Sequence, residues 1–185
     1  MVVTSSIGAS ASFSLNMAAV APGIFRTADP SNTKRQNAAA LFYETAWQVM
    51  PVAMATALKL GSNCRGGAVT PFTPCGEPAR PGDRVAVYAT GLGLATPGGD
   101  PEGAPLATGS AAPRDGGTLY QLPVAPAVTV GGATATVLSC GIAPGFAGMY
   151  VVEMVIPDGA PDGDDVPLVI QLGDSSDTAT IAVKN

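Results

Sequence analysis

The chain has 185 residues, a formal net charge of −5 and no histidine, and only 12% of its residues are charged. Without histidine, Ser-His-Asp and Cys-His catalysis and the usual zinc ligand sets are excluded. The sequence contains no run of Lys or Arg that could follow a phosphate backbone, and no apolar run near the ~20 residues that span a bilayer. We therefore expect neither nucleic-acid binding nor membrane insertion.

Glycine and proline indicate the architecture. The chain contains 23 Gly and 17 Pro, which favours many short strands joined by tight turns and leaves little room for long helices. Its hydrophobic content of 46% is too high for general disorder. We expect an all-β fold, with a length that suits one large β-sandwich or one domain with appendages.

The first strands of the chain are similar in plan to its last ones. Residues 2–17 predict two short strands around Gly8. Residues 168–185 likewise contain an apolar strand, a Gly/Ser turn and an alternating strand. Because one closing hairpin completes a sandwich, a second hairpin at the start belongs to a different sandwich.

Residues 1–25, which end in the connector AAVAPGIF, are therefore expected to pair with a neighbouring subunit or a preceding domain. Residues 26–185 would form the sandwich itself. The side chains predicted to form the intersubunit strand are Val3, Ala11, Phe13 and Leu15.

The stretch 38–60 has two interpretations. It contains many helix-forming residues, but Pro51 would break a continuous helix. We favour two strands broken near Pro51, with a short helix before Pro51 as the alternative. Trp47, with Phe42 and Tyr43 nearby, could contact a ligand by stacking on a sugar, although aromatic residues at strand spacing are more often part of a core.

Three cysteines are present. Cys64 and Cys75 bracket a loop rich in Gly and Pro, where a disulfide would restrict the unfolded chain by ~2–3 kcal/mol. The alternative is a pair of free, partly buried thiols. We interpret Cys140, which lies beside a strand end, as a small core residue rather than a nucleophile.

Residues 84–89 predict a strand that ends at the turn TGLG. The turn begins as a dinucleotide-binding loop does, but Thr96 stands where the third glycine should be and no helix follows, so we interpret it as a strand-ending turn. Residues 94–122 contain few large apolar groups and predict a long surface loop.

Two further strands are expected before residue 140. Residues 124–130 and 133–139 predict a hairpin across Gly131-Gly132, a dipeptide that tolerates the positive φ of such turns.

The stretch 142–157, IAPGFAGMYVVEMVIP, carries the strongest fold signal. The spacing of Gly148, Tyr150 and Val152 matches the place where a β-sandwich turns the chain from one sheet into the other. A tyrosine there buries its ring and returns its hydroxyl to a nearby backbone group. In the strand, Tyr150, Val152, Met154 and Ile156 are expected to face one way and Val151, Glu153 and Val155 the other.

An acidic loop follows this strand. Asp158, Asp162, Asp164 and Asp165 could together offer oxygen ligands to Ca²⁺, but their spacing is not that of an EF-hand and no glutamate closes the site. We interpret the loop as a solvated turn and expect no metal and no cofactor.

Three motifs occur together and in order: PGD…YATGLG at 81–93, VTVGG at 128–132 and APGFAG-x-Y at 143–150. With them, residues 80–183 resemble the uncharacterised Ig-like C-terminal domain found, often in several units, in large secreted bacterial proteins of the acidobacterial type. The resemblance implies a secreted immunoglobulin-like β-sandwich and no catalytic residues. The connector is similar to that family's link between units, and residues 41–79, which hold Trp47, are longer than its usual segment and form an insert.

The leading hypothesis is a non-catalytic structural module of an extracellular or cell-surface protein. Its N-terminal strand would add to a neighbouring subunit, and head-to-tail repetition of that contact would grow a filament. Residues 1–4 lack the basic start and apolar core of a secretory signal, so we interpret the chain as a mature form or a part of a larger protein. The alternative function is a carbohydrate- or surface-binding module.

Overall fold

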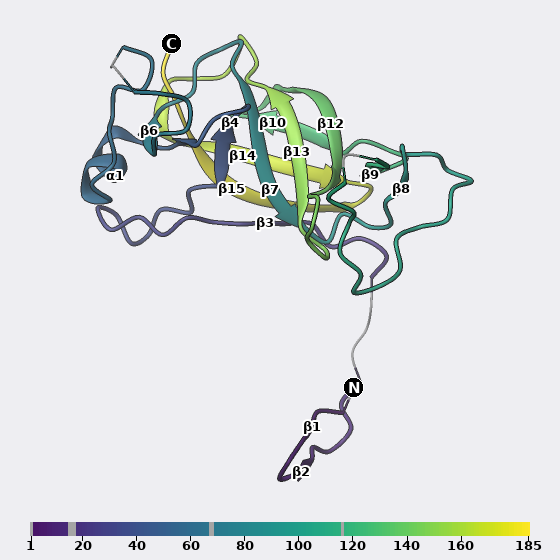
Figure 1. Ribbon diagram of the computed structural model, residues 1–185. Helices are drawn as coiled ribbons and strands as arrows, with labels where there is room; N and C mark the ends of the chain where they lie inside the picture. The colour runs from purple at the N-terminus through teal and green to yellow at the C-terminus, as the bar shows by residue number, and fades with distance from the viewer. Residues whose placement is uncertain (1, 15–17, 67–68, 116) are drawn as a thin grey trace.

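The computed structural model describes residues 2–14, 18–66, 69–115 and 117–185 (Figure 1). Within these ranges the secondary structure is nearly all strand, with one short helix. Two sheets share one hydrophobic core, and a small hairpin near the N-terminus stands apart from them. The expected all-β fold is therefore confirmed.

The larger sheet contains nine of the described strands. They are β3 (Gly23–Ile24), β4 (Ala40–Phe42), β5 (Trp47–Val49), β6 (Cys75–Glu77), β7 (Arg84–Thr90), β8 (Thr96–Pro97), β9 (Tyr120–Gln121), β12 (Thr136–Ile142) and β13 (Tyr150–Val155). Their order across the sheet is β6-β5-β4-β7-β13-β12-β9-β8, and β3 also pairs with β7. All of these pairs are antiparallel except β5 with β6.

The smaller sheet consists of β10 (Ala127–Val130), β11 (Ala133–Thr134), β14 (Gly163–Leu172) and β15 (Ser175–Val183), in the order β11-β10-β14-β15. The long hairpin β14–β15 is the closing hairpin that the sequence predicts. Its outer edge is covered, because the Thr180 N–H donates to the Gln36 carbonyl and the Ala79 N–H donates to the Ala182 carbonyl. This sheet is thus completed by the chain's own segments.

The core lies between the two sheets and follows the alternation of their strands. Its buried side chains include Val85, Val87, Ala89, Val152 and Met154 from the larger sheet, and Val128, Leu168, Ile170, Ala179 and Ile181 from the smaller one. The predicted alternation of β13 is confirmed, since Tyr150, Val152 and Met154 are buried and the residues between them are half-buried on the outer face.

The chain changes sheets at a different place from the one predicted. The strands β12 and β13 pair within one sheet, so the turn at Gly148 does not lead from one sheet to the other. The chain instead changes sheets between β9 and β10, at Ala135 between β11 and β12, and between β13 and β14. The predicted strand 133–139 is therefore two strands, because only its first two residues keep their pairing across the Gly131-Gly132 turn.

The sequence also predicts that the Tyr150 ring is buried and that its hydroxyl bonds to a nearby backbone group, and both are confirmed. Its ring is buried and its hydroxyl donates to the carbonyl oxygen of Gly93, in the turn that ends β7. Burial raises the pKa of Tyr150, so the phenol keeps its proton as a donor. One hydrogen bond thereby ties the start of β13 to the end of its neighbouring strand.

The stretch 38–60 follows neither of the two interpretations. Both β4 and β5 precede Pro51 and pair with each other across a turn at 43–46, in which Glu44 has a φ of 56°. A six-residue helix, α1 (Val52–Ala57), then follows Pro51. A proline is well tolerated at a helix start because the first N–H groups have no partner within the helix, and the alanines that follow favour the helix.

The N-terminal hairpin is shorter than predicted. It consists of β1 (Thr4–Ser5) and β2 (Gly8–Ala9), with the turn before Gly8 rather than around it. Residues 10–14 have no strand structure, so Ala11 and Phe13, which the sequence predicts in a strand, do not lie in one. A lone two-stranded hairpin has no third strand to extend along, and such hairpins are marginal in water.

Cys64 and Cys75 form a disulfide, with their Cα atoms 5.8 Å apart. Cys140 is the free cysteine and is buried, and burial raises the pKa of its thiol to about 12. Such a thiol is poorly nucleophilic near neutral pH. Both cysteine predictions are confirmed.

We expect Tyr150→Phe to lower the free energy of unfolding by about 1 kcal/mol, because the substitution removes one hydrogen bond and leaves the Gly93 carbonyl without its donor. Urea unfolding followed by circular dichroism would measure this difference. Tyr88→Phe is the matched control, since the Tyr88 ring lies on the outer face of the same sheet. Equal losses for the two variants would contradict the assigned role of the Tyr150 hydroxyl.

The double variant Cys64→Ala/Cys75→Ala should lose ~2–3 kcal/mol of stability, because the disulfide restricts the unfolded chain. Urea unfolding with and without reductant gives the test. Reductant should bring the natural chain close to the double variant and should leave the double variant unchanged. A natural chain that does not respond to full reduction would contradict the prediction.

Candidate functional site

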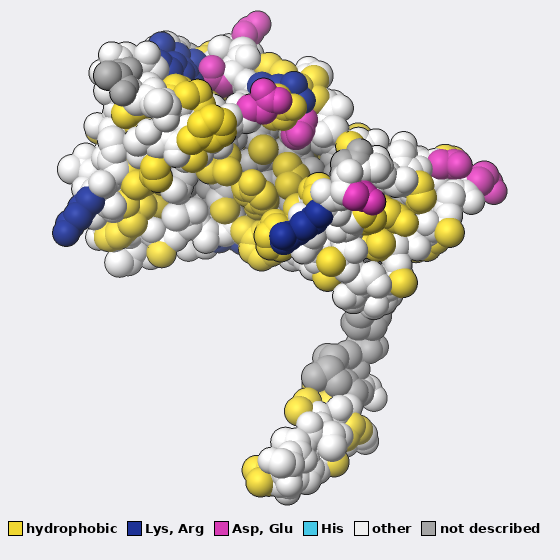
Figure 2. Space-filling view, viewed as in Figure 1, with side chains coloured by type: hydrophobic (Ala, Val, Ile, Leu, Met, Phe, Trp, Pro, Cys, Tyr) yellow, Lys and Arg dark blue, Asp and Glu magenta, His cyan; other side chains and the backbone are white. Residues whose placement is uncertain are grey.

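The outer face of the larger sheet, turned away from the core, has an apolar depression (Figure 2). It has two lobes of ≈ 690 and ≈ 580 Å³ that share Tyr88 of β7 and Val151 of β13. We call it the apolar hollow. Its main lining residues are Leu41, Tyr43, Phe72 and Ala86 in the first lobe and Phe25, Ala39, Phe146 and Met149 in the second.

Strand register creates the floor of the hollow. Tyr88 lies opposite Val151, and Ala86 lies opposite both Leu41 on one side and Glu153 on the other. These outward positions would carry polar residues on an ordinary solvent-facing sheet. Three strands therefore present a mainly apolar surface to water, with Glu153 as the charged residue of β13 on it.

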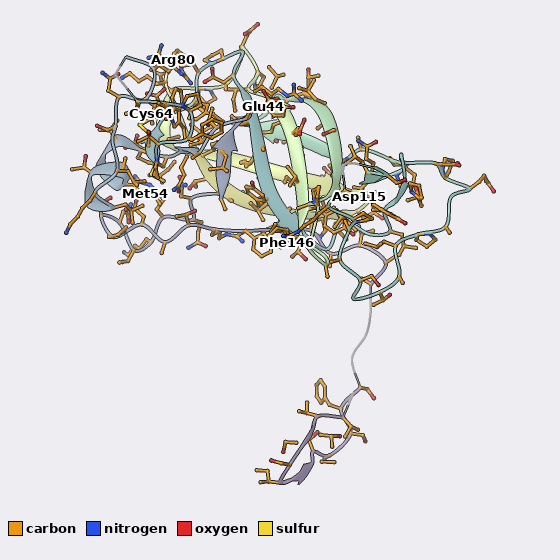
Figure 3. The ribbon with its side chains drawn as sticks, in the orientation of Figure 1. Glu44, Met54, Cys64, Arg80, Asp115 and Phe146 are labelled. Carbon is orange, nitrogen blue, oxygen red and sulfur yellow. A yellow bond between two sulfur atoms is a disulfide. The ribbon has the colours of Figure 1, made fainter. Side chains whose placement is uncertain are left out.

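The hollow lies below its surroundings because its floor carries small side chains and its rim carries large ones. Ala39 and Ala86 lie in the middle of the face, and the exposed rings of Phe72 (82%) and Phe146 (47%) belong to opposite lobes. Figure 3 shows Glu44 and Phe146 near the two ends of this face. An apolar groove of this kind is a common feature of interaction sites.

Charged side chains also lie at the hollow: Glu44 and Glu153 line it, and Arg84 and Arg114 lie over its rings. The guanidinium of Arg84 lies 3.4 Å from the centre of the Tyr43 ring and donates to Glu153 at 2.6 Å. The hydrogen bond with Glu153 raises the pKa of Arg84. In the other lobe, Arg114 lies 5.9 Å from the centre of the Phe146 ring. Among the described residues Arg84 and Glu153 form an ion pair, whereas Glu44 and Arg114 form none, so the hollow offers apolar contact area with charges at its edges.

The hairpin β1–β2, which belongs to the segment predicted for intersubunit contact, lies apart from both sheets (Figure 1). Every described residue from 2 to 14 is exposed. Val2, Val3 and Ile7 have exposed fractions of 51%, 56% and 97%. Ala11 and Phe13 are exposed as well, and Leu15 lies outside the described residues.

The connector that follows this segment, residues 18–25, is attached to the larger sheet by hydrogen bonds and strand pairing. The Ala21 N–H donates to the Gly91 carbonyl at 2.8 Å. Gly91 has a φ of 70°, and a Cβ there would lie 1.9 Å from the Ala21 carbonyl oxygen, so only glycine permits this approach. Further along, Asp177 of β15 accepts the Ile24 N–H at 2.7 Å and pairs with Arg26 at 2.9 Å.

Trp47 is engaged within its own molecule. Its indole N–H donates to the Thr70 carbonyl at 3.1 Å, and its partly buried ring packs against the core. Of the other two aromatic residues in that stretch, Phe42 is buried, whereas Tyr43 lies under Arg84 at the hollow. The structure therefore does not gather the three rings into one platform.

The acidic loop is tied to an arginine. Arg35 pairs with Asp165 at 2.6 Å and with the buried Asp29 at 2.5 Å, and it lies 3.9 Å from Asp164. These contacts fix the start of β14 to the segment that precedes β4. Among the residues that the structure describes, no cluster of His, Cys, Asp or Glu is arranged to hold a metal ion.

No protein-family model, curated protein or solved structure matches this chain. In the described part of the chain, no helix has the length and apolar character needed to cross a membrane.

Sequence reasoning did not find the apolar hollow. The signal was present in β7 and β13, where Ala86, Tyr88 and Val151 put apolar side chains on the face opposite the core. What the sequence could not show is which strands lie side by side, and the hollow depends on the register of β4, β7 and β13.

The contact between Asp177 and the connector should depend on pH. Burial alone would raise the pKa of Asp177, but hydrogen bonds from Arg26 and from the Ile24 and Thr178 N–H groups outweigh burial and hold the pKa below its ordinary value of 3.8. The stabilisation is therefore present above the ordinary value and is lost as the pH falls through the lower, folded-state pKa.

We expect Asp177→Asn to be less stable than the natural chain at pH 7 and the difference to narrow below about pH 4. Urea unfolding at a series of pH values would measure it. Asp174→Asn, an exposed residue in the β14–β15 turn, is the control and should show no such trend. A constant difference across the whole series would contradict the assigned hydrogen bonds.

Proposed function

We propose that this chain is a non-catalytic structural module of a secreted or cell-surface protein, which joins a second copy through its N-terminal strand segment. The observation that carries the proposal is the hairpin β1–β2. Among the described strands it pairs only with itself, and it presents Val2, Val3 and Ile7 to water. An exposed strand segment with apolar side chains is suited to association with another sheet protein.

The smaller sheet explains why the hairpin β1–β2 has no pairing position in its own sandwich. The closing position is occupied by β14–β15, and the edge of β15 is bridged by backbone bonds at Gln36 and Ala79. The hairpin therefore has no vacant place of that kind in its own sandwich. A neighbouring copy is the partner that would use it.

Head-to-tail repetition follows from the asymmetry of this contact. The segment that reaches out and the surface that receives it are different parts of the molecule, so each copy keeps one of each for the next. Such contacts grow an open filament unless the rotation between copies closes a ring. The same segment would link consecutive units if the chain is part of a larger protein.

An immunoglobulin-like sandwich is the fold we propose for the body. Two largely antiparallel sheets share a core, the chain crosses between them at Ala135, and a buried tyrosine returns its hydroxyl to the backbone. The disulfide supports an oxidising compartment, since such bonds persist mainly outside the cytosol. The resemblance to secreted Ig-like bacterial domains is in agreement with both.

Carbohydrate binding through Trp47 is the weaker candidate. The indole donor is already bonded to Thr70 and the ring packs on the core, so little of it remains to stack on a sugar. No observation on the described residues favours this function over assembly.

Deletion of residues 2–14 should abolish self-association and leave the body folded. We expect the full chain to form species larger than a monomer as its concentration rises, measured by light scattering and electron microscopy, and the deletion variant to remain monomeric. Replacing the segment with a Gly/Ser sequence of equal length is the matched control and should behave like the deletion. A full chain that stays monomeric at every concentration would refute the proposal.

A further inference from the structure

We propose that the apolar hollow on the outer face of the larger sheet is the site that receives residues 2–14 of a second copy of this chain. The inference rests on the proposed function, because it assigns the receiving surface for the same assembly.

The two surfaces match in polarity. Residues 2–14, VVTSSIGASASFS, contain no charged side chain. Of the acidic residues that line the hollow, Glu153 is paired with Arg84 and Glu44 lies near one end. A segment without charged side chains brings no charge that would have to be buried there.

The two surfaces also match in size. The hairpin spans residues 3–10, closed by the bond from the Ser10 N–H to the Val3 carbonyl, and is about 13 Å long at ~3.3 Å per residue, so it fits within the length of a seven-residue strand. The floor is built along β7, which has seven residues, and along β13, which has six. The two lobes, which share Tyr88 and Val151, lie along these strands and can take apolar side chains from both arms of one hairpin.

The face is a better receiver than the described sheet edges. The outer strands β8 and β11 have two residues each, β6 is bridged by Gly61, and β15 is bridged by Asn37 and Ala79. These edges offer few unpaired backbone groups to an incoming strand. The outer face instead offers a mainly apolar surface.

The direction of the connector favours a second copy over the same one. Because β3 is antiparallel to β7, the chain followed from Phe25 towards the N-terminus runs along β7 to its carboxyl end, where Ala21 is fixed at the Gly91 turn. The chain therefore leaves the sheet at the end of β7, and the hairpin β1–β2 lies apart from both sheets (Figure 1). Phe25 itself lines the hollow, so the end of the connector, but not residues 2–14, lies at the receiving surface of the same molecule.

Photo-crosslinking between isotopically distinct copies is the direct test. Full chains carrying photoreactive p-benzoylphenylalanine in place of Ile7 are mixed with ¹⁵N-labelled natural chain, irradiated and mapped by mass spectrometry. The expected products join position 7 of one copy to residues 84–90 or 149–155 of the labelled copy. Crosslinks found only within one copy, or only on another surface, would overturn the inference.

Blocking the hollow is the second test. Ala86→Arg puts a long charged side chain on its floor and should weaken association by about tenfold or more, because the charge must be desolvated when the hairpin binds. Leu138→Arg is the matched control, since Leu138 is an exposed apolar residue of β12 outside the lining. If Ala86→Arg lowers the unfolding midpoint, Tyr88→Ser, which only removes contact area, replaces it. Association that is unchanged in the folded blocking variant would overturn the inference.

A mixing experiment separates the two proposals. The Ala86→Arg chain keeps its N-terminal segment, and the chain that lacks residues 2–14 keeps its hollow, so a mixture should form one-to-one pairs and no longer species. If the full chain never associates, the proposed function fails. If it associates through residues 2–14 but Ala86→Arg behaves as the natural chain does, only the assignment of the hollow fails.

Discussion

The pairing of β7 with β13 is the constraint on which most of this molecule depends. Their antiparallel register, from Ala89 opposite Tyr150 to Arg84 opposite Val155, decides which side chains of both strands face the core. It places Val87 and Val152 inside and leaves Tyr88 and Val151 on the outer face. Because side chains alternate, a shift of one residue in either strand would turn its core set outward. The core and the hollow are thus two faces of one pairing.

The turn that ends β7 connects this pairing to the N-terminal segment. The Gly93 carbonyl accepts the Tyr150 hydroxyl, and two residues earlier Gly91 receives the connector at Ala21. Both glycines have positive φ, so the turn reverses tightly enough to serve both contacts. The point at which residues 2–14 leave the body is therefore set by the same turn that anchors β13. Changes in this turn would affect both the stability of the sandwich and the direction of the hairpin.

Local patterns in the sequence predict the strands whose alternation is strong and the features that need only two residues. The strands β7 and β13, the closing hairpin, the Tyr150 hydroxyl contact and the disulfide follow from such patterns. The change of sheet at Ala135 cannot be predicted from a local pattern, because it depends on where the pairing of β11 with β10 ends. The turn at Glu44 was not predicted either, because it contains neither Gly nor Asn, the residues that usually indicate a positive φ. The hollow needs three strands in register, which no single stretch of sequence reveals.

Both unusual surfaces of the chain are costly for a monomer in water. The hairpin exposes Ile7 almost completely, and the hollow exposes a half-buried apolar floor around Tyr88. A contact between two copies would remove both from water at once, and the hydrophobic effect would drive it. Since residues 2–14 carry no charged side chain, this contact would respond little to salt, unlike one built on ion pairs. The body would keep its fold without the contact, because its own sheet is closed by β14–β15, so assembly and folding would be separate properties of this chain.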